Sequence, residues 1–554
     1  MSRWDYTKDI VVVGSGAGGM TAALVAGDRQ NQAIVLEKSP VYGGSTALSG
    51  GGIWVPCNHL MAEAGIDDSG EEAMAYLQAV TQSQVAAQRL QAYVQQAATL
   101  VKYLAKNSHV QFEILPGLSD YYAEHYGGKQ EGGRTLIAKP FDRRQLGILA
   151  KNLRQPHPQT LIWGRITVTP QEASQMVNSS FPGRLNAAYI LSQYFLNPRR
   201  LLGRYDSRLT MGNALIGRLR LSLADRNIPV WLNTSVQQLM IENNQVVGVK
   251  GEQNGKSLMI RAKKGVILAS GGFARNKFMR SQYQRHPISD RWTAANPDNM
   301  GDGIRMGMSV GAECELMESA WWTPTSVVPG SQYAYVLIIE KSLPGSMMVN
   351  SQGKRFTNEA DPYIDVVKDM YKTDSVPAFF VFDRRFRYQY PTGPLMPGLT
   401  PKKYIDNGYI QVANTIEDLG KKCGIEPQGL IETTRKMNQY AVTGLDLDFH
   451  RGDNSYNRYY GDTRVKPNPC LGAIDCPPFY AVKVFPGDLG TKGGLKTDEN
   501  ARVLRKDGSA IAGLYAIGNV SASVMGDTYP GGGATIGPAM TFGYIAACHA
   551  TSDG

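Results

Sequence analysis

The first forty residues combine short, fully apolar runs with a glycine-rich turn. Asp9–Val13 (DIVVV) predicts a buried parallel strand. It runs directly into the glycine-rich residues 14–19 and then into a helix-forming stretch, Met20–Ala26. A second apolar run, Ala33–Leu36, ends in Glu37. The pattern predicts a strand–turn–helix–strand unit, typical of a Rossmann-like fold.

An apolar run that finishes in glycine occurs twice more. Gly265–Ser270 (GVILAS) precedes two further glycines, and Gly513–Asn519 (GLYAIGN) predicts another strand near the end of the chain. The interval between them holds apolar runs such as Tyr335–Ile339 and Ala378–Phe382, separated by polar helical stretches. We expect the runs of the interval to belong to an inserted domain.

The order of these patterns predicts two domains. A chain of 554 residues usually folds into more than one domain and buries a large core. Residues 1–273 and 486–554 predict one discontinuous, Rossmann-like α/β domain with a parallel sheet and flanking helices. Residues 274–485 predict an inserted α+β domain that carries the substrate and catalytic groups.

Three glycines of the first turn are spaced to hold a dinucleotide. Gly14 allows the tight turn, Gly16 lets the backbone approach a pyrophosphate, and Gly19 lets the helix pack closely on the strand. Glu37 is placed to accept hydrogen bonds from ribose hydroxyls. A purely structural glycine turn does not explain that acid, so we interpret the unit as a dinucleotide site.

Further glycine-rich segments favour FAD over NAD. Tyr42–Thr46 (YGGST) and Ser49–Gly52 (SGGG) follow soon after the first unit. Backbone this rich in glycine can lie flat against a ring system. Asn299–Ile304 (NMGDGI) is a glycine-containing turn that enters a helix, and it is similar to the flavoprotein turn that returns to the cofactor.

The segment Asp527–Pro538 (DTYPGGGATIGP) places a phenol beside a run of glycine amides. From Leu514 through Phe542, Asp527 is the only charged residue. Neutral hydrogen-bond donors suit a carbonyl oxygen that becomes negative during reaction. They suit a dicarboxylate or a phosphate poorly, because those anions need arginine or lysine partners.

The glycine clusters together resemble the FAD-binding half of the fumarate reductase and succinate dehydrogenase flavoprotein superfamily. In its covalent members, a histidine near the first glycine cluster carries the flavin. No histidine lies between Met1 and His59 in this chain. The resemblance therefore implies an FAD that is held without a covalent bond.

Tyr529–Tyr544 closely resembles the C-terminal signature of the 3-ketosteroid Δ1-dehydrogenases. Two further segments resemble the same family: Arg355–Glu359, followed by Pro362 and Tyr363, and Asp120–Tyr122, followed by two glycines. The resemblance covers nearly the full chain. With the glycine turn, it gives these cofactor-binding residues: Gly14, Gly16, Gly19, Glu37, Gly44, Ser45, Gly51, Gly52, Val236, Gly271, Asp302, Gly518, Asn519 and Ile536.

This resemblance implies an FAD-dependent 3-oxosteroid 1-dehydrogenase, which introduces a C1–C2 double bond into a 3-keto steroid. Tyr363 abstracts the C2 proton, while flavin N5 accepts the C1 hydride from the opposite face. The Tyr529 hydroxyl and the Gly533 amide bind the ketone and stabilise the enolate oxygen. A phenol, with a pKa of about 10, needs support to act as a base. The family assigns that support to the tyrosine matching Tyr121, and the adjacent Tyr122 stays an alternative.

Two other functions stay open. The first is a related flavoenzyme of different regiochemistry or direction, such as a Δ4-(5α)-dehydrogenase or an enoate- or fumarate-type reductase. The C-terminal segment disfavours fumarate because it lacks a cationic partner for a carboxylate. The second is a flavin-containing electron-transfer subunit without substrate chemistry. For the dehydrogenase, we expect a quinone or another electron acceptor as partner.

The net charge of +10 is concentrated in one segment. Arg143–Arg220 holds twelve basic and two acidic residues, a net charge equal to that of the whole chain. Within it, Ala187–Tyr205 mixes apolar residues with arginines, and such a basic amphipathic patch can lie on an anionic membrane. A solvated basic face or a subunit contact is the alternative. No binding motif accompanies the charge, so we expect no nucleic-acid partner.

Three further patterns bear on location and metals. The first strand begins within about ten residues, which leaves no room for a signal peptide, and no apolar run approaches the roughly 20 residues of a membrane-spanning helix. The six cysteines show no metal or CxxC spacing, and the seven histidines are scattered. We expect reduced thiols, no metal site and a cytoplasmic protein, with peripheral contact at the inner face of the cell membrane as a second hypothesis.

Overall fold

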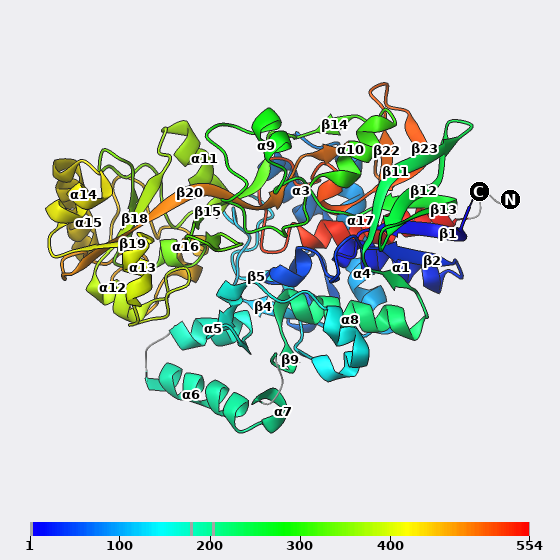
Figure 1. Cartoon of the computed structure of the whole chain (residues 1–554). Coiled ribbons are helices and arrows are strands. Elements are labelled where there is room, and N and C mark those ends of the chain that lie inside the picture. The colour runs from blue at the N-terminus through cyan, green and yellow to red at the C-terminus, as the bar shows by residue number, and fades with distance from the viewer. Residues whose placement is uncertain (1–3, 178–180, 202–204, 553–554) are drawn as a thin grey trace.

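A computed structural model describes residues 4–177, 181–201 and 205–552 of the chain. Two large sheets lie side by side, one on each side of Figure 1, with a group of helices at the lower edge. The observed architecture is mixed α/β with a parallel sheet, as the sequence predicts.

The larger sheet contains eight strands. They are β1 (Tyr6–Val13), β2 (Ala33–Leu36), β10 (Val230–Trp231), β11 (Thr234–Glu242), β12 (Gln245–Gln253), β13 (Lys256–Leu268), β22 (Arg502–Leu504) and β23 (Ala510–Ala516). β1 lies between β2 and β13 and runs parallel to both. β10 and β23 extend this parallel part on either side, whereas β11, β12 and β22 are antiparallel additions. The parallel order brings the carboxyl ends of β1, β2 and β13 to one edge.

The strands predicted from apolar runs are present, with several changes of boundary; the run Gly265–Ser270, for example, is a strand only to Leu268. The last apolar run ends as a strand at Ala516, and Gly518–Val520 forms a short 3-10 turn. Tyr335–Ile339 is a strand only over Tyr335–Val336, because only these two residues pair with β15 (Ala320–Ser326). The run Ala378–Phe382 is confirmed as a strand over its whole length.

Helices surround the larger sheet and the segments next to it. They include α1 (Ala17–Asp28), α2 (His59–Glu63), α3 (Gly70–Thr81), α4 (Ala87–Asn107), α8 (Met211–Asp225), α9 (Lys277–Tyr283), α10 (Asp302–Ser309) and α17 (Ile536–Thr551). α1 and α17 cross at closest approach where Gly18 faces Ala539. A Cβ at Gly18 would lie 2.6 Å from the Ala539 carbonyl oxygen. The N-terminal and C-terminal segments of the chain are thus packed backbone to backbone.

The second sheet lies on the left of Figure 1 and is antiparallel. Besides β15 it contains β16 (Tyr335–Val336), β17 (Ser346–Val349), β18 (Ala378–Phe382), β19 (Ile410–Ala413) and β20 (Phe479–Thr491). Its helices are α11 (Tyr363–Lys372), α12 (Arg384–Gln389), α13 (Lys402–Asp406), α14 (Ile416–Cys423), α15 (Pro427–Thr443) and α16 (Ser455–Tyr460). The predicted domain boundary at residue 486 falls inside β20, and the proposed domain limits stay a prediction.

Smaller elements join the two sheets or project from them. They are β3 (Gly52–Trp54), β4 (Phe112–Pro116), β5 (Gly132–Ala138), β6 (Phe141–Asp142), β7 (Leu161–Ile162), β8 (Ile166–Thr167), β9 (Arg208–Leu209), β14 (Cys314–Glu315), β21 (Gly494–Leu495), α5 (Pro170–Val177), α6 (Phe181–Phe195) and α7 (Pro198–Leu201). α5, α6 and α7 form the group at the lower edge of Figure 1. One cluster of buried apolar side chains runs from Val12 of β1 to Phe380 of β18 and includes the tyrosines of the candidate site.

Candidate active site

Three tyrosines from distant parts of the chain meet inside this cluster. The hydroxyl oxygens of Tyr121 and Tyr363 lie 3.1 Å apart. The ring of Tyr529 packs on both, with centroid distances of 5.2 Å to Tyr121 and 5.1 Å to Tyr363. None of the three is more than 4% exposed. The structure therefore brings together the three phenols that the sequence analysis singled out.

Backbone contacts hold the Tyr121 and Tyr529 segments against each other. The Tyr121 N–H donates to the Pro530 carbonyl at 2.9 Å, directly after Tyr529. The Tyr76 hydroxyl donates to the same carbonyl at 2.5 Å. The Tyr529 hydroxyl lies 3.2 Å from the Thr535 hydroxyl within its own turn. These contacts set the position of both rings from the backbone outward.

Tyr122 points to a different partner. Its hydroxyl donates to the carboxylate of Asp365, two residues after Tyr363 in α11, at 2.9 Å. Burial raises the pKa of Asp365 to about 6, although the Tyr122 hydrogen bond and Lys368 act to lower it. Of the two adjacent tyrosines, Tyr121 is the one whose hydroxyl contacts Tyr363.

All three phenols are held in their neutral form. Burial raises the pKa of Tyr363 well above 10, and the neighbouring Tyr121 and Tyr529 add to this effect. Burial likewise raises the pKa of Tyr121 well above 10 and raises that of Tyr529. A base role for Tyr363 therefore requires that its own proton first passes to another group.

Gly533 combines a strained backbone with a free donor. Its φ is +94°, and a Cβ there would lie 2.4 Å from the Gly52 carbonyl carbon and the Ile53 nitrogen. Only glycine fits this close approach without displacing backbone. Among the described residues, the Gly533 N–H has no hydrogen-bond acceptor. The amide is available to an oxygen of a bound ligand.

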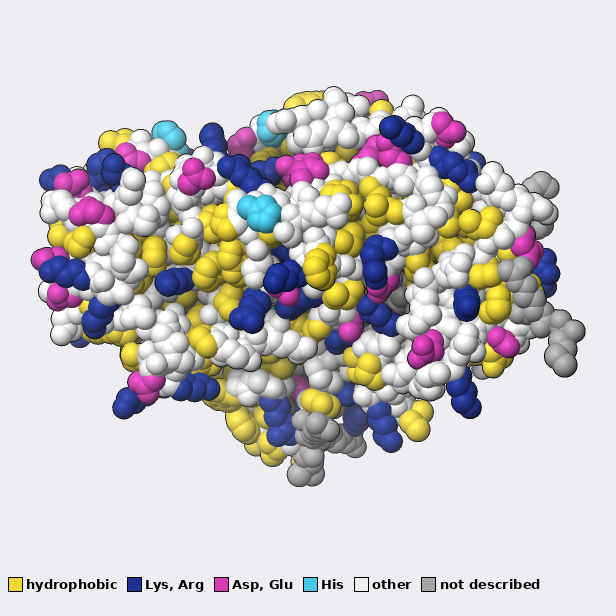
Figure 2. Space-filling view, turned by 45° about the horizontal axis from the view of Figure 1, so that its top comes forward, with side chains coloured by type: hydrophobic (Ala, Val, Ile, Leu, Met, Phe, Trp, Pro, Cys, Tyr) yellow, Lys and Arg dark blue, Asp and Glu magenta, His cyan; other side chains and the backbone are white. Residues whose placement is uncertain are grey.

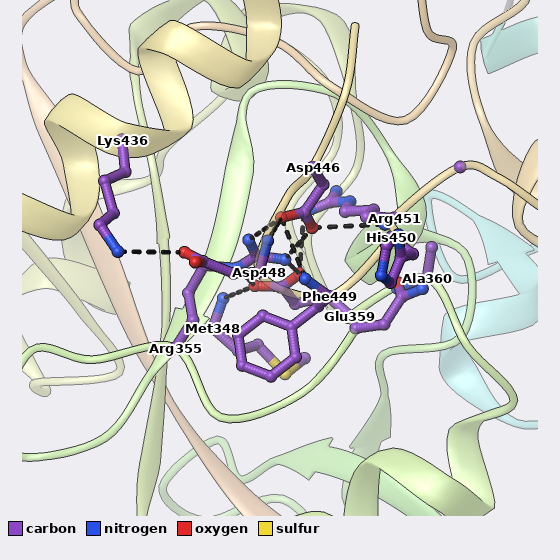
Figure 3. A network of polar contacts seen from close by, with 12 residues as sticks. Met348, Arg355, Glu359, Ala360, Lys436, Asp446, Asp448, Phe449, His450 and Arg451 are labelled. Atoms are coloured by element: carbon purple, nitrogen blue, oxygen red, sulfur yellow. Dashed lines mark hydrogen bonds and ion pairs between the residues drawn. The ribbon is translucent and has the colours of Figure 1, made fainter.

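A buried polar network fixes the segment that leads into Tyr363 (Figure 3). Arg355 forms ion pairs with Glu359 and Asp446, both at 2.7 Å. Arg451 lies 3.3 Å from Glu359 and donates to the Ser346 carbonyl at 2.7 Å. The two arginines lower the pKa of Glu359 against the opposing effect of burial. Residues 355–361 are thereby tied to β17 and to the loop around Asp446.

The first glycine turn has the geometry of a diphosphate cradle. A Cβ at Gly14, where φ is +116°, would lie 2.4 Å from the Ala269 carbonyl, and a Cβ at Gly19 would lie 2.2 Å from the Gly14 carbonyl. A Cβ at Gly16, in contrast, would meet only the Thr46 hydroxyl, at 3.8 Å. Open space therefore faces the Gly16 backbone at the N-terminus of α1, where a diphosphate is stabilised by the helix dipole.

Glu37 lies at the carboxyl end of β2, as the ribose interpretation requires. Its carboxylate accepts the Ser15 N–H at 3.2 Å and the Ser39 N–H at 2.9 Å. Burial raises the pKa of Glu37, and the hydrogen bonds from Ser15 and Ser39 oppose that rise. The Thr234 N–H donates to the Glu37 carbonyl, which places β11 and its Val236 beside this end of the cradle.

The other candidate cofactor residues surround the same space. Gly44 lies over Gly16, because a Cβ at Gly44 would be 3.6 Å from the Gly16 Cα. Gly52 faces the Gly532–Gly533 backbone at 3.7–3.8 Å from the position of such a Cβ. Gly51 has a φ of +71° against Met211–Gly212, and the Ser45 hydroxyl accepts from Asn299 at 3.0 Å.

Residues from the second half of the chain complete the ring around the cradle. Gly271, with a φ of +79°, packs against Asn299. The Asn519 side chain, one residue after Gly518, accepts from the Trp321 indole at 3.1 Å. Ile536 begins α17, so a second helix N-terminus adjoins the site. Asp302 instead forms ion pairs with Lys38 and Arg305, at 2.6 and 2.7 Å. The donor set, the open glycine backbone and the two helix N-termini fit FAD.

Sequence reasoning missed two buried lysines. Lys341 and Lys492 are both 0% exposed, and each donates to backbone just before a tyrosine of the site. The segment Asp527–Pro538 is neutral apart from Asp527, as the sequence indicates, but the side-chain amino group of Lys492 contacts its backbone at Thr528. The available signal was a lysine inside the strand-like, glycine-rich stretch 487–495, which is an unusual place for a solvated side chain.

Comparisons with known proteins agree with an FAD-binding fold. The FAD binding domain family matches residues 9–536. The fold and the site therefore define an FAD-binding flavoprotein. A 3-oxosteroid 1-dehydrogenase of Mycobacterium tuberculosis (strain H37Rv) is 42% identical over 558 residues, covering 98% of each chain. The crystal structure of 3-ketosteroid Δ1-dehydrogenase from Sterolibacterium denitrificans, in complex with 1,4-androstadiene-3,17-dione, is 44% identical with a TM-score of 0.95, covering 98% of this chain and 99% of that one.

The chain belongs to the 3-oxosteroid 1-dehydrogenase family of FAD-binding flavoproteins. A more distant relative is the 4-oxocyclohexanecarboxylate 2-dehydrogenase of Sinomonas cyclohexanicum, which is 34% identical and covers 98% of this chain and 92% of its own length.

Proposed function

We propose that this chain is an FAD-dependent 3-oxosteroid 1-dehydrogenase that introduces a C1–C2 double bond into 3-keto steroids. The observation that carries the proposal is the 3.1 Å contact between the Tyr121 and Tyr363 hydroxyls beside the Tyr529 ring. The names of the relatives at 42–44% identity support the same reaction and substrate class.

The reaction removes a proton from C2 and a hydride from C1. FAD, when bound, supplies the hydride acceptor. The Tyr529 hydroxyl and the Gly533 N–H together hold the C3 ketone, and they stabilise the negative charge that develops on its oxygen as the C2 proton leaves. The φ of Gly533 and its free amide support this assignment.

Tyr363 takes the C2 proton in this proposal. Because its pKa is raised by burial, the phenol must lose its own proton before it can act. The Tyr121 hydroxyl is its hydrogen-bond partner and is the group through which that proton leaves. Tyr122, whose hydroxyl is bound to Asp365, takes no part in this step.

A smaller cyclic ketone is the second candidate substrate. The relative from Sinomonas cyclohexanicum acts, by its name, on a one-ring oxo acid. An oxo acid of this kind would need a cationic partner for its carboxylate, and the segment from Leu514 to Phe542 of this chain contains no lysine or arginine. A steroid fits the neutral, aromatic surroundings of Tyr529 better, since Trp321 also contacts its ring, at 4.9 Å between centroids.

Contact with an anionic membrane surface is a further part of the proposal. α6 and its neighbours expose apolar side chains, including Tyr189 (60%) and Leu196 (81%). Hydrophobic and basic side chains lie together along the lower edge of Figure 2. Several arginines of this segment are engaged within the protein, because Arg200 is paired with Asp206 and Arg208 with Glu172. The basic surface is therefore smaller than the sequence count suggests.

The proposed location is cytoplasmic, with peripheral contact at the membrane and a quinone or another small acceptor to reoxidise FAD. Within the described ranges, no helix is long and apolar enough to span a bilayer. Arg204 lies outside the described residues, as do the side chains of Arg184 and Arg199. A vesicle-binding assay tests the contact: replacing the exposed Tyr189 and Leu196 by serine should weaken binding to anionic vesicles, and unchanged binding would refute it.

The reaction itself is tested by anaerobic mixing of the FAD-loaded protein with 4-androstene-3,17-dione. Flavin absorbance should bleach and the product should carry the new double bond between C1 and C2. Bleaching by 4-oxocyclohexanecarboxylate alone would favour the second candidate, and a bond at C4–C5 of a saturated substrate would favour a Δ4-(5α)-dehydrogenase. No bleaching by either ketone would contradict a role in ketone dehydrogenation.

A further inference from the structure

Lys341 and Lys492 make matching contacts with the segments that lead into two tyrosines of the cluster. Both are 0% exposed. Within the part of the chain that the structure describes, both ammonium groups donate to backbone carbonyls and neither is ion-paired with a carboxylate. Burial of a charge without a carboxylate partner is costly, so the arrangement calls for an explanation.

Lys341 holds the backbone that leads into Tyr363. Its Nζ donates to the Glu359 carbonyl at 2.8 Å and also to the Asp361 carbonyl, two residues before Tyr363. The same ammonium lies 6.0 Å from the centre of the Tyr456 ring. That ring packs on Tyr121 with a centroid distance of 4.6 Å. The Lys341 amino group therefore lies against both the backbone that carries Tyr363 and the ring that packs on Tyr121.

Lys492 does the same for the turn that leads into Tyr529. Its Nζ donates to the Gly526 carbonyl at 3.0 Å and to the Thr528 carbonyl, directly before Tyr529. The ammonium lies 4.2 Å from the centre of the Trp321 ring. Trp321 in turn contacts the Tyr529 ring edge-on, at 4.9 Å. Lys492 therefore repeats the arrangement of Lys341. Each lysine binds two carbonyls that are two residues apart, and each rests on an aromatic ring.

The two lysines supply hydrogen-bond donors to backbone carbonyls that lead into Tyr363 and Tyr529. Among the described residues, no other donor is paired with the carbonyls of Glu359, Asp361, Gly526 or Thr528. Buried carbonyls without a donor are destabilising, and a three-donor ammonium satisfies two of them at once while it rests on an aromatic face. Burial lowers the pKa of Lys341 to about 7, and it lowers that of Lys492 well below 10.5.

We propose that Lys341 and Lys492 are paired positioning residues for the two phenols of the reaction: Lys341 sets the place of the proton-abstracting Tyr363, and Lys492 sets the place of the ketone-binding Tyr529. This inference rests on the proposed dehydrogenase function. It predicts that the two lysines affect different steps, because the tyrosines they support act on different atoms of the substrate.

The test compares Lys341→Met and Lys492→Met with the parent enzyme by anaerobic stopped-flow bleaching of bound FAD with 4-androstene-3,17-dione. Lys341→Met should slow the bleaching rate at saturating steroid at least tenfold, with steroid Kd within about threefold of the parent. Its isotope effect with C2-deuterated steroid should also rise, since proton removal then limits the rate. Lys492→Met should raise the steroid Kd at least tenfold.

An exposed lysine gives the matched control. Lys421 has a 60% exposed side chain and is paired only with Glu417 of its own helix, so Lys421→Met should leave rate and Kd unchanged. If a Met variant does not retain FAD, the corresponding Lys→Gln variant is measured in the same way, because the amide keeps an N–H donor for one carbonyl. Loss of FAD from both variants of a lysine would show a folding role and overturn the proposal for that residue.

The remaining outcomes separate this inference from the proposed function. A parent enzyme that the steroid does not bleach would contradict the function itself. A parent that bleaches, with both Met variants equal to it in rate, Kd and isotope effect, would overturn the positioning roles alone. Equal losses of rate and affinity in both variants would overturn the division of labour between the lysines.

Discussion

The two sides of the tyrosine cluster are held by different kinds of contact. On the Tyr363 side, charged side chains from two separate segments converge, with Arg355, Glu359 and Arg451 at the centre (Figure 3). On the Tyr529 side, the contacts are made by glycine backbone, such as Gly533 against Gly52. Each side carries one phenol: ion-paired side chains fix the first, whereas close-packed glycine backbone, with Lys492 bound to the turn, fixes the second.

This difference follows from what each phenol must do. A base has to be held at one distance from a carbon atom, and a rigid network of ion pairs restricts the backbone that carries Tyr363. A ketone oxygen has to be met by several donors at once, and a glycine turn exposes main-chain N–H groups that no side chain covers. The comparison predicts that substitutions on the Tyr363 side act through geometry, whereas those on the Tyr529 side act through lost donors.

Tyr363→Phe is expected to have the largest effect. It removes the hydroxyl that takes the C2 proton, and a general base contributes about 10²–10⁴-fold to such a step. The bleaching rate with steroid should fall by about 10³-fold or more while FAD stays bound. Bleaching kinetics with matched FAD occupancy provide the measurement. A variant of near-normal rate would remove Tyr363 from the mechanism.

Glu359→Gln tests the network behind Tyr363. Removing one partner of a buried ion pair leaves uncompensated charge and costs about 3–5 kcal/mol. Denaturation monitored by tryptophan fluorescence should show a large loss of stability. Lys436→Met is the control, because it breaks the exposed pair with Asp448 at the edge of the same region, and such pairs contribute about 0–1 kcal/mol. Equal losses in the two variants would contradict a special role of the network.

Tyr529→Phe should have a smaller effect than Tyr363→Phe. It removes one donor to the ketone oxygen, and loss of one such donor costs about 10²–10³-fold in rate. The Gly533 N–H and the packing against Trp321 are retained, so part of the function persists. Rate and steroid Kd are both measured. A loss greater than that of Tyr363→Phe would reverse the assignment of the two phenols.

Asp365, on the Tyr363 side, makes the stability of the folded protein depend on pH. Its pKa is raised from 3.8 to about 6 in the folded protein, chiefly by burial. The folded state therefore binds more protons than the unfolded state between about pH 4 and 6, so this group lowers stability as pH rises through that window. At 1.36 kcal/mol per unit, the fall is at most about 3 kcal/mol. Asp365→Asn should flatten the stability profile in that window, and an unchanged profile would contradict the shift.

The local patterns of the chain were sufficient to predict most of the fold. Asp9–Val13 and Ala33–Leu36 are short apolar runs next to glycine, and such runs have few alternatives to a buried parallel strand. The strand predicted from Tyr335 ends at Val336. Strand pairing depends on the neighbouring strand, here β15, and the sequence pattern does not show which residues of that strand lie opposite. For the same reason the sequence pattern does not reveal β20 as one strand across residue 486. One half of it pairs with β18 and the other half with β15.

The candidate site was predictable only where a motif carried it. Tyr363 and Tyr529 were found through the family signature, and their contact in space is a property of the fold. Lys341 lies more than twenty residues before Tyr363 and has no motif of its own, so nothing in its neighbourhood indicates the carbonyls it holds. Hydrogen bonds between residues this far apart in the chain produce no periodic pattern in the sequence.

The smallest expected effect distinguishes two adjacent residues. Tyr121→Phe removes the hydroxyl 3.1 Å from that of Tyr363, so the base loses the route for its proton, and the bleaching rate should fall about 10²-fold. Tyr122→Phe removes only the hydrogen bond to Asp365, and the rate should stay within about threefold. The two variants have equal size and differ by one position, so each is the control of the other. A larger loss for Tyr122→Phe would mean that the Asp365 side of α11, rather than the phenol pair, carries the proton away.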